Sequence, residues 1–191
     1  LDRVAFGATR PTKLGIVTSG KAYLDCTAAL HQLGIDDAKA RALGIGLYKV
    51  GMVWPLEPDG LKAFASDCEE LLFVEEKRSL VEDQAKSVLY AETRRPRIVG
   101  KFNVNGAALL PSDRPLEASV VADAIANRLQ SLNVLDAEME GRYGGIRNRL
   151  NRNLPFLDQG IARSPYFCSG CPHNTSTKVP VGSFALGGIG C

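Results

Sequence analysis

The stretch KLGIVTSG at residues 13–20 decides the fold, because it is a short apolar run rich in β-branched residues that ends in Ser-Gly. Such a run is typical of a buried strand that ends in a turn. The next residues, KAYLDCTAALHQLG at 21–34, place Leu24 and Ala28 at helical spacing and end at Gly34, a good helix stop. Together the two segments predict a strand that leads directly into a helix.

The same order of strand and helix repeats along the chain. Extended segments are predicted at 45–53 (IGLYKVGMV), 70–77 (ELLFVEEK) and 97–102 (RIVGKF). Helices are predicted at 57–68 (EPDGLKAFASDC), at 79–92 (SLVEDQAKSVLYAE) and in the second half of 106–129, after Pro115 and Glu117. Strands that alternate with helices over short connections favour a parallel, right-handed α/β sheet covered by helices. Functional groups are then expected beyond the strand ends.

Several side chains in this region carry local expectations. Ser79 is a plausible helix cap, with Glu82 in the capping-box position. Glu75 and Glu76 at a strand end could serve in acid/base chemistry, and a solvated strand terminus explains them equally well. Cys26, on the apolar side of a predicted helix, is expected to be a core thiol.

Composition excludes several classes of protein. The 191 residues are 45% hydrophobic and 23% charged, and no apolar run approaches the roughly 18–20 residues of a membrane span. The 23 basic and 21 acidic residues are mixed, with a net charge of +2, so neither a nucleic-acid surface nor a membrane surface is indicated. Five cysteines is an odd number, which favours reduced thiols in the cytoplasm. Because the chain begins with Leu1 rather than Met, we expect it to be part of a longer protein.

The helical and strand patterns weaken after the last predicted helix. The stretch GRYGGIRNRLNRNLPFLDQG at 141–160 is basic, rich in Gly and Asn, and lacks a convincing apolar face. We therefore predict an α/β domain over 1–135, a linker over 136–163 and the start of a second domain over 164–191. The residues after Arg163 have little apolar surface to bury, and we expect them to be mobile in isolation.

The final segment, RSPYFCSGCPHNTS at 163–176, contains the main candidate for chemistry. Cys168 and Cys171 bracket Ser169 and Gly170, a spacing that lets both sulfurs turn inward on one tight loop, as in metal thiolate sites. Cys191, the last residue, could be a third ligand, and no fourth is visible.

Other interpretations of this segment stay open at the level of spacing. They are a zinc site whose second pair lies beyond this sequence, a thioredoxin-like redox pair, and coincidence. His173 could be a ligand, a contact to diphosphate or substrate, or a polar loop residue. A Rossmann-like nucleotide binder is disfavoured, because no G-x-G-x-x-G follows the first strand.

Two groups of motifs carry a resemblance to a known family. RSPYFCSGCPHNTSTKVP and the terminal GIGC closely resemble the start of the thiamine-diphosphate-binding domain of indolepyruvate ferredoxin oxidoreductases, in their long fused bacterial form. LGIVTSGKAYLDCTAALHQLGID, YKVGMVWPLEP and LLFVEEKRSLVEDQ resemble the preceding domain, which is similar to the C-terminal domain of transketolase. The resemblance covers essentially the whole chain and implies a transketolase C-terminal-like parallel or mixed sheet flanked by helices, then a linker and a truncated thiamine domain.

The resemblance also implies an activity for the longer protein. Thiamine diphosphate, held through Mg²⁺, supports oxidative decarboxylation of indolepyruvate or other aryl 2-oxoacids, with electrons passed through iron–sulfur clusters to ferredoxin and the acyl group to coenzyme A. By resemblance, Cys168, Cys171 and Cys191 are ligands of a [4Fe–4S] cluster whose fourth ligand lies outside this chain, and His173 lies near the thiamine diphosphate.

The family's Mg²⁺-diphosphate motif, Gly-Asp-Gly followed by Asn, is absent from this sequence. The fragment is therefore expected to be an inactive scaffold that binds no cofactor by itself and associates with other domains of its polypeptide, in a homo-oligomer. The rival hypothesis is a non-catalytic α/β interaction module with a zinc-binding CxxC.

Overall fold

The structure, a computed structural model, describes residues 2–8, 10–152, 167–176 and 178–183. The chain divides into two compact units, Leu1–Arg152 and Asn153–Cys191, and each is described by itself. The first unit holds the sheet and all but one of the described helices. Its strands are β1 (Arg3–Gly7), β2 (Thr12–Ser19), β3 (Ile45–Val50), β4 (Cys68–Val74) and β5 (Arg97–Val99). Its helices are α1 (Gly20–Gln32), α2 (Asp37–Leu43), α3 (Pro58–Ala65), α4 (Leu80–Leu89), α5 (Ala118–Ser131) and α6 (Ala137–Arg152).

The five strands form one mixed sheet in the order β1-β3-β2-β4-β5. The pairs β2–β3, β2–β4 and β4–β5 are parallel, while the edge strand β1 runs antiparallel to β3. The predicted α/β fold with a parallel or mixed sheet and flanking helices is therefore confirmed. The predicted strands and helices between residues 13 and 131 are also found, whereas β1 and α2 were not predicted.

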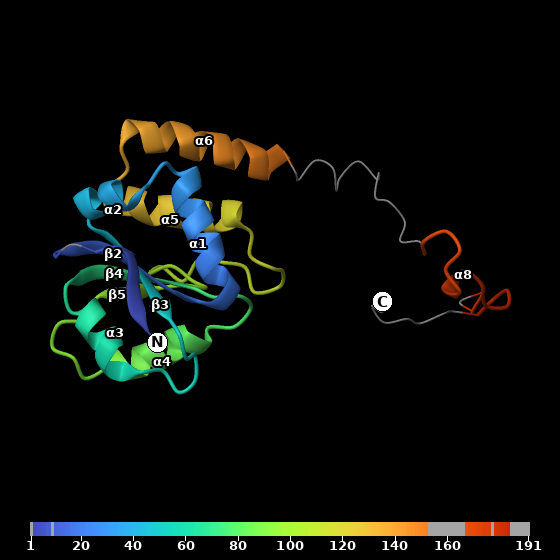
Figure 1. Cartoon of the computed structure of the whole chain (residues 1–191), viewed down its shortest axis with the longest axis horizontal. Coiled ribbons are helices and arrows are strands. Elements are labelled where there is room, and N and C mark those ends of the chain that lie inside the picture. Colours follow the sequence, from blue (N-terminus) through green and yellow to red (C-terminus); the bar gives the residue numbers. More distant parts are fainter. Residues whose placement is uncertain (1, 9, 153–166, 177, 184–191) are drawn as a thin grey trace. The chain divides into compact units, whose positions relative to one another are not determined.

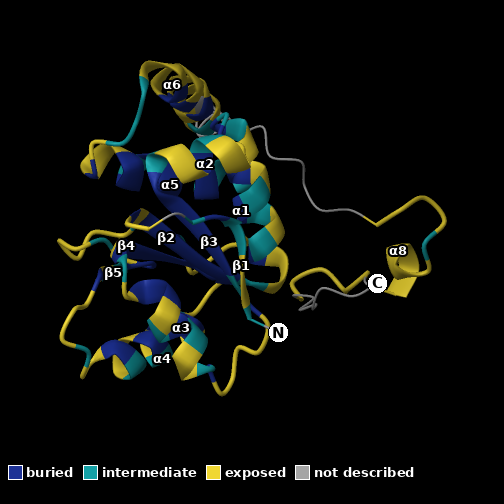
Figure 2. Ribbon diagram, turned by 60° about the vertical axis from the view of Figure 1, so that its left-hand side comes forward, coloured by how far each residue is buried: buried dark blue, intermediate teal, exposed yellow. Residues whose placement is uncertain are grey.

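Helices cover both faces of the sheet, which gives three layers (Figure 1). One hydrophobic cluster joins the sheet to α1, α2, α5 and α6, and a second joins the other face to α3 and α4. This double burial explains why the central strand β2 is a continuous apolar run rather than an alternating one. The buried strands lie between helices whose outer faces are exposed (Figure 2).

A pair of glycines sets how closely α3 approaches the sheet. Gly15 on β2 and Gly46 on β3 are paired in register. A Cβ at Gly15 would lie 2.9 Å from the Phe64 ring, and one at Gly46 would lie 3.1 Å from it. The two missing side chains therefore make the flat surface on which Phe64 of α3 packs.

The predicted linker over 136–163 is wrong for residues 137–152, which form α6 and pack into the first core cluster. Met139 and Ile146 are fully buried and Tyr143 is 8% exposed. These residues lie at helical spacing, and Asp136 caps the helix by accepting a hydrogen bond from the Met139 backbone N–H at 2.8 Å. A stripe of three large apolar side chains is thus enough to anchor a helix that is otherwise polar and contains surface glycines. The rest of the predicted linker, 153–163, lies outside the described residues.

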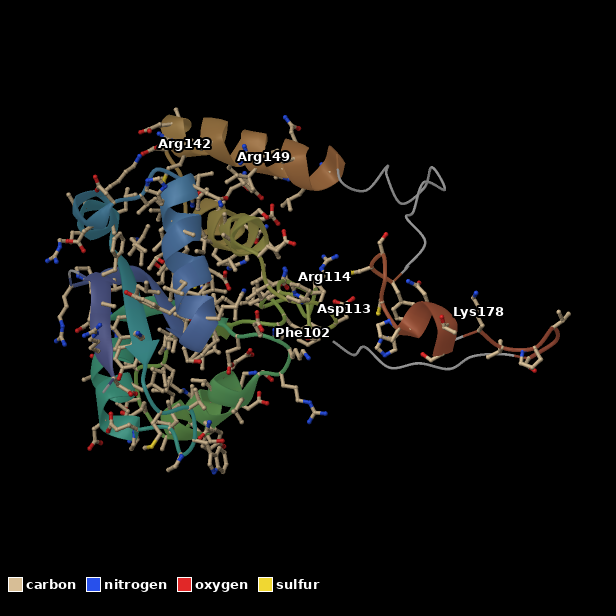
Figure 3. The ribbon with its side chains drawn as sticks, turned by 45° about the vertical axis from the view of Figure 1, so that its right-hand side comes forward. Phe102, Asp113, Arg114, Arg142, Arg149 and Lys178 are labelled. Atoms are coloured by element: carbon tan, nitrogen blue, oxygen red, sulfur yellow. The ribbon has the colours of Figure 1, made fainter. Side chains whose placement is uncertain are left out.

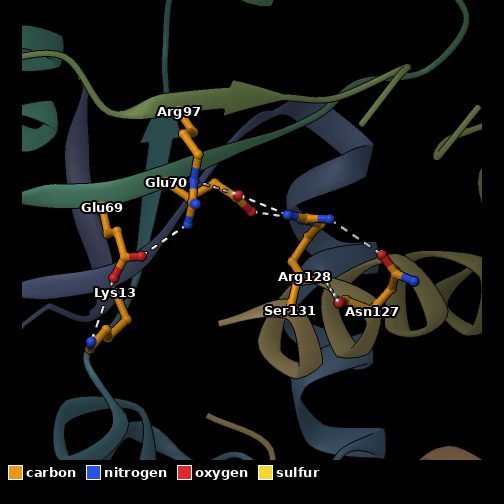
Figure 4. Close-up of polar contacts among 7 residues, drawn as sticks. All are labelled: Lys13, Glu69, Glu70, Arg97, Asn127, Arg128 and Ser131. Atoms are coloured by element: carbon orange, nitrogen blue, oxygen red, sulfur yellow. Dashed lines mark hydrogen bonds and ion pairs between the residues drawn. The ribbon is translucent and has the colours of Figure 1, made fainter. Parts of the chain in front are cut away.

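A buried ion pair joins the sheet to α5 (Figure 4). The Glu70 carboxylate of β4 accepts hydrogen bonds from Nε and Nη2 of Arg128 at 2.7 and 2.8 Å. Both residues are almost without solvent contact, at 0% and 5% exposure. Arg97 of β5 adds a second cation, with its Nε 3.4 Å from Glu70 Oε2. The bidentate geometry fixes the position of α5 against the start of β4.

Among the described residues, no helix is both long enough and apolar enough to cross a lipid bilayer.

Candidate functional site

The CxxC segment lies in the second unit and forms a tight turn. The Cys171 backbone N–H donates a hydrogen bond to the Cys168 carbonyl at 3.0 Å. Gly170 closes the turn with φ of 79°, a left-handed conformation that favours glycine. Cys168 is exposed, Cys171 is half-buried, and both are free thiols. The turn therefore presents two accessible sulfurs from a backbone that is fixed by its own hydrogen bond.

The short helix α8 (His173–Ser176) supports this turn from its C-terminal side. Asn174 Nδ2 donates to the Cys168 carbonyl at 3.0 Å, so that carbonyl accepts two hydrogen bonds. His173 Nδ1 lies 3.2 Å from Cys171 Sγ, and its ring stacks on Phe167 with centroids 5.2 Å apart. The structure thus places Cys168, Cys171 and His173 on one short segment, with the His173 ring beside the Cys171 sulfur.

The third predicted ligand, Cys191, lies outside the described residues. The expectation that the chain after Arg163 is mobile also falls partly on residues that the structure does not describe, namely 164–166, 177 and 184–191. Within the described ranges, no three His, Cys, Asp or Glu side chains are grouped so as to hold a metal ion. The donor chemistry of two free thiols on one turn, one exposed and one half-buried, fits part of an iron–sulfur or zinc site, and further ligands must come from elsewhere.

A second set of polar residues gathers in the first unit where β4 and β5 end; the sequence singled out Glu75 and Glu82 but not Lys101. Glu75 is only 8% exposed and follows the last residue of β4. Its carboxylate accepts hydrogen bonds from the backbone N–H groups of Val81 and Glu82, at 2.7 and 3.0 Å. Glu75 therefore caps α4 across the β4–α4 turn.

The predicted capping box at the start of α4 is wrong. The Ser79 side chain makes no capping hydrogen bond; its hydroxyl donates instead to Asp83 Oδ2 at 2.9 Å. The Glu82 carboxylate bonds Lys86 Nζ at 2.7 Å and the Lys101 backbone N–H at 3.3 Å. A buried carboxylate supplied by the preceding strand thus replaces the local serine cap.

Lys101 links the loops at this edge of the sheet. Its ammonium group donates to the carbonyls of Glu75 and Pro111, and the side chain is almost fully buried. Burial lowers the pKa of Lys101 and raises the pKa of Glu75, although two backbone hydrogen bonds oppose the second effect. Glu75 and Lys101 therefore join β4, α4 and the loop after β5. This role differs from both interpretations of Glu75 that the sequence suggested, acid/base chemistry and a solvated strand end.

The predicted core thiol is confirmed. Cys26 on α1 is fully buried, and burial raises its pKa to about 12. A neutral thiol of this kind is a poor nucleophile and a poor metal ligand. It contrasts with Cys168 and Cys171 of the second unit, neither of which is buried.

Comparison with known proteins gives consistent matches. The model of the indolepyruvate oxidoreductase domain family matches residues 3–151. The indolepyruvate oxidoreductase subunit IorA of Thermococcus kodakarensis is 28% identical over 165 residues, which is 86% of this chain and 22% of that protein. The IorA subunit of Pyrococcus horikoshii is 26% identical over the same shares. The chain therefore spans about a fifth of the length of the curated relatives that it matches.

Two solved structures show more distant similarity. The 2-oxoglutarate:ferredoxin oxidoreductase from Magnetococcus marinus, with 2-oxoglutarate, coenzyme A and succinyl-CoA bound, has a TM-score of 0.46 and 18% identity, over 68% of this chain and 20% of that one. A split-gene transketolase, an inactive β4 tetramer, has a TM-score of 0.44 and 20% identity, over 68% of this chain and 41% of that one.

Proposed function

The chain belongs to the family of indolepyruvate oxidoreductase domains, and on this premise we propose that it is part of a longer 2-oxoacid oxidoreductase. The proposed enzyme oxidatively decarboxylates indolepyruvate or other aryl 2-oxoacids, forms acyl-coenzyme A and passes electrons to ferredoxin. The observation that carries this proposal is the family match over residues 3–151, followed in the same chain by the CxxC turn.

The first unit acts in this proposal as a non-catalytic scaffold. Its buried charges support that role, because they hold backbone segments together. Glu75 accepts from the Val81 N–H, Glu82 accepts from the Lys101 N–H, and Lys101 Nζ donates to the Glu75 carbonyl. The scaffold would associate with other domains of the same polypeptide and contribute to a homo-oligomer. Free thiols among the described cysteines are compatible with a reducing cytoplasmic location.

The second unit supplies the start of the cofactor-binding domain. Cys168 and Cys171 would hold one side of a [4Fe–4S] cluster, with Cys191 and a fourth cysteine outside this chain completing it. When bound, the cluster supplies one-electron transfer, and thiamine diphosphate with Mg²⁺, bound by parts of the protein outside this chain, supplies the decarboxylation chemistry. Asn174 holds the turn, and His173 would lie between the cluster ligand Cys171 and the thiamine site.

The test uses the full-length protein, purified without oxygen, and two cysteine variants. Cys171→Ala should remove one cluster, seen as loss of iron and sulfide and of one reduced-state electron paramagnetic resonance signal, together with oxidoreductase activity. Cys26→Ala is the matched control, because this cysteine is buried in the core of the first unit and should leave the cluster count unchanged.

The same samples decide between the proposal and its rival, a non-catalytic module with a zinc-binding CxxC. Visible absorption near 400 nm that is lost with Cys171 supports the cluster. A colourless protein with stoichiometric zinc, or a cluster count that Cys171→Ala does not change, refutes the assignment of these cysteines.

A further inference from the structure

A cavity lies in the first unit where β4 and β5 end, between the start of α4 and the loop that follows β5. Its volume is about 790 Å³, within the range of ligand-binding pockets. Ser79, Leu80 and Lys86 line it on one side and Lys101, Phe102 and Ser112 on the other. Ligands of open α/β sheets commonly bind in this position, outside the carboxyl ends of parallel strands. None of the roles proposed above uses this cavity.

The charged groups of the cavity are unequally paired. Its two carboxylates are engaged, since Glu82 lies 2.7 Å and Asp83 3.6 Å from Lys86 Nζ. Lys77 and Arg78, by contrast, are exposed and make no ion pair within the described part of the chain. Two adjacent cations without a carboxylate partner leave a positive potential at the mouth of the cavity.

Lys101 adds a further cation to the cavity wall. Its ammonium group has three N–H donors, and two of them are directed to the carbonyls of Glu75 and Pro111. No carboxylate among the described residues lies within 4.0 Å of its Nζ, although the side chain is nearly fully buried. Glu75, Glu82 and Glu76 nevertheless act on this charge electrostatically, so the protein itself compensates it, and the uncompensated charge of the cavity is that of Lys77 and Arg78.

The rim of the cavity is apolar. Phe102 is 59% exposed and Leu80 is 46% exposed. Figure 3 shows Phe102 projecting from the loop after β5. An exposed aromatic ring beside several cations is suited to a ligand that combines negative charge with a flat ring, because the ring can stack while the charges are neutralised.

We propose that this cavity binds a phosphorylated, ring-bearing anion of the nucleotide class. Lys77 and Arg78 would neutralise the phosphates, and Phe102 would stack on the base. Two adjacent cations that make no ion pair among the described residues suit a ligand that carries several negative charges better than a single carboxylate. This inference goes beyond the proposed function and does not depend on the cluster or on the oxidoreductase activity.

Titration of the whole chain tests the proposal. Adenosine 5′-triphosphate and coenzyme A, which both carry a phosphorylated adenosine, are compared with inorganic pyrophosphate by calorimetry and by ¹H–¹⁵N NMR. Both nucleotides should bind more tightly than pyrophosphate by about tenfold, which corresponds to one stacked base. Amide signals of residues 77–80 and 101–102 should shift.

Variants locate the site. Lys77→Ala with Arg78→Ala should weaken nucleotide and pyrophosphate binding by about tenfold or more, the effect of losing charged hydrogen bonds. Phe102→Ala should weaken nucleotide binding alone. Arg3→Ala, which removes an exposed cation from the edge strand β1, is the control and should change neither affinity.

Three results would overturn the proposal. They are absence of saturable nucleotide binding, affinities for pyrophosphate and nucleotides that are equal, and nucleotide binding that the cavity variants leave unchanged. Lys77, Arg78 and Phe102 are exposed, so their replacement should leave the fold unchanged. A thermal unfolding curve like that of the parent chain checks this for each variant.

Discussion

Replacing Arg128 by Met should destabilise the first unit strongly, because it leaves the Glu70 carboxylate buried without its bidentate partner. Two charge-assisted hydrogen bonds of 2.7 and 2.8 Å are lost, and such bonds contribute about 1.5–3 kcal/mol each. Arg97, 3.4 Å from Glu70 Oε2, remains and compensates in part. We therefore expect a loss of about 3 kcal/mol in the free energy of unfolding, at the lower end of the range for broken buried pairs.

Urea denaturation followed by circular dichroism measures this loss. With a denaturant dependence of about 2 kcal/mol per molar urea, the midpoint should fall by about 1.5 M. The double variant Glu70→Leu with Arg128→Met removes both charges and should recover to within about 1 kcal/mol of the parent, because the cost arises from the unpaired charge. Lys13→Ala, which removes an exposed partner of Glu69, should cost less than about 0.5 kcal/mol.

The reasoning fails if Arg128→Met costs under about 1 kcal/mol, or if the double variant is as unstable as the single one. The first result would mean that water or Arg97 reaches Glu70 in the variant. The second would mean that the stem of Arg128 stabilises α5 by packing rather than by charge.

Three further expectations concern other parts of the first unit. Ile146→Ala should lower the free energy of unfolding by about 2–4 kcal/mol, because the side chain is fully buried. Gly144→Ala, on the open side of α6, should raise it by up to about 1 kcal/mol. Negligible effects of both variants in urea denaturation would contradict the packing of α6. Because the pKa of Cys26 is raised in the folded state, the unfolded chain loses the thiol proton first as the pH rises. The free energy of unfolding present below pH 9.0 should therefore decline toward pH 12, and should decline less in Cys26→Ala. A urea midpoint with the same pH dependence in both proteins would refute this. Gly100→Ala should lower the free energy of unfolding by about 1–3 kcal/mol, because the new Cβ would collide with Glu82 Oε2. A thermal or urea midpoint that does not change would show that this carboxylate moves freely.

The sequence predicted the elements whose periodicity is strong. The apolar run of β2 and the helix α1 that follows it were found where predicted, because both faces of the sheet are covered and the pattern is uninterrupted. The edge strand β1 was missed: it has only five residues, and its pairing with β3 depends on a partner that is distant in sequence. The short helix α2, with seven residues, was missed for the related reason that two turns give little periodic signal.

The error at α6 arose from composition. The glycines of this helix, Gly141, Gly144 and Gly145, indicated a linker. A Cβ placed at any of them would have no atom within 4 Å, so they are surface positions at which the packing does not require glycine. Each costs about 1 kcal/mol relative to alanine in a helix interior, and burial of Met139 and Ile146 offsets that cost. Tertiary contact with α5 therefore decides the helix, and a single-sequence pattern with so few apolar positions does not reveal it.

The two units differ in how their polar side chains are used, and this difference bears on where cofactor chemistry can occur. In the first unit, Cys26 and Cys68 are buried and burial raises the pKa of each thiol to about 12, so neither readily forms the thiolate that ligates a metal. In the second unit, Cys168 and Cys171 are accessible on a turn held by Asn174 and by the backbone. A bound cluster would therefore stabilise the second unit selectively, and loss of the cluster should leave the fold of residues 2–152 intact while it loosens the CxxC turn.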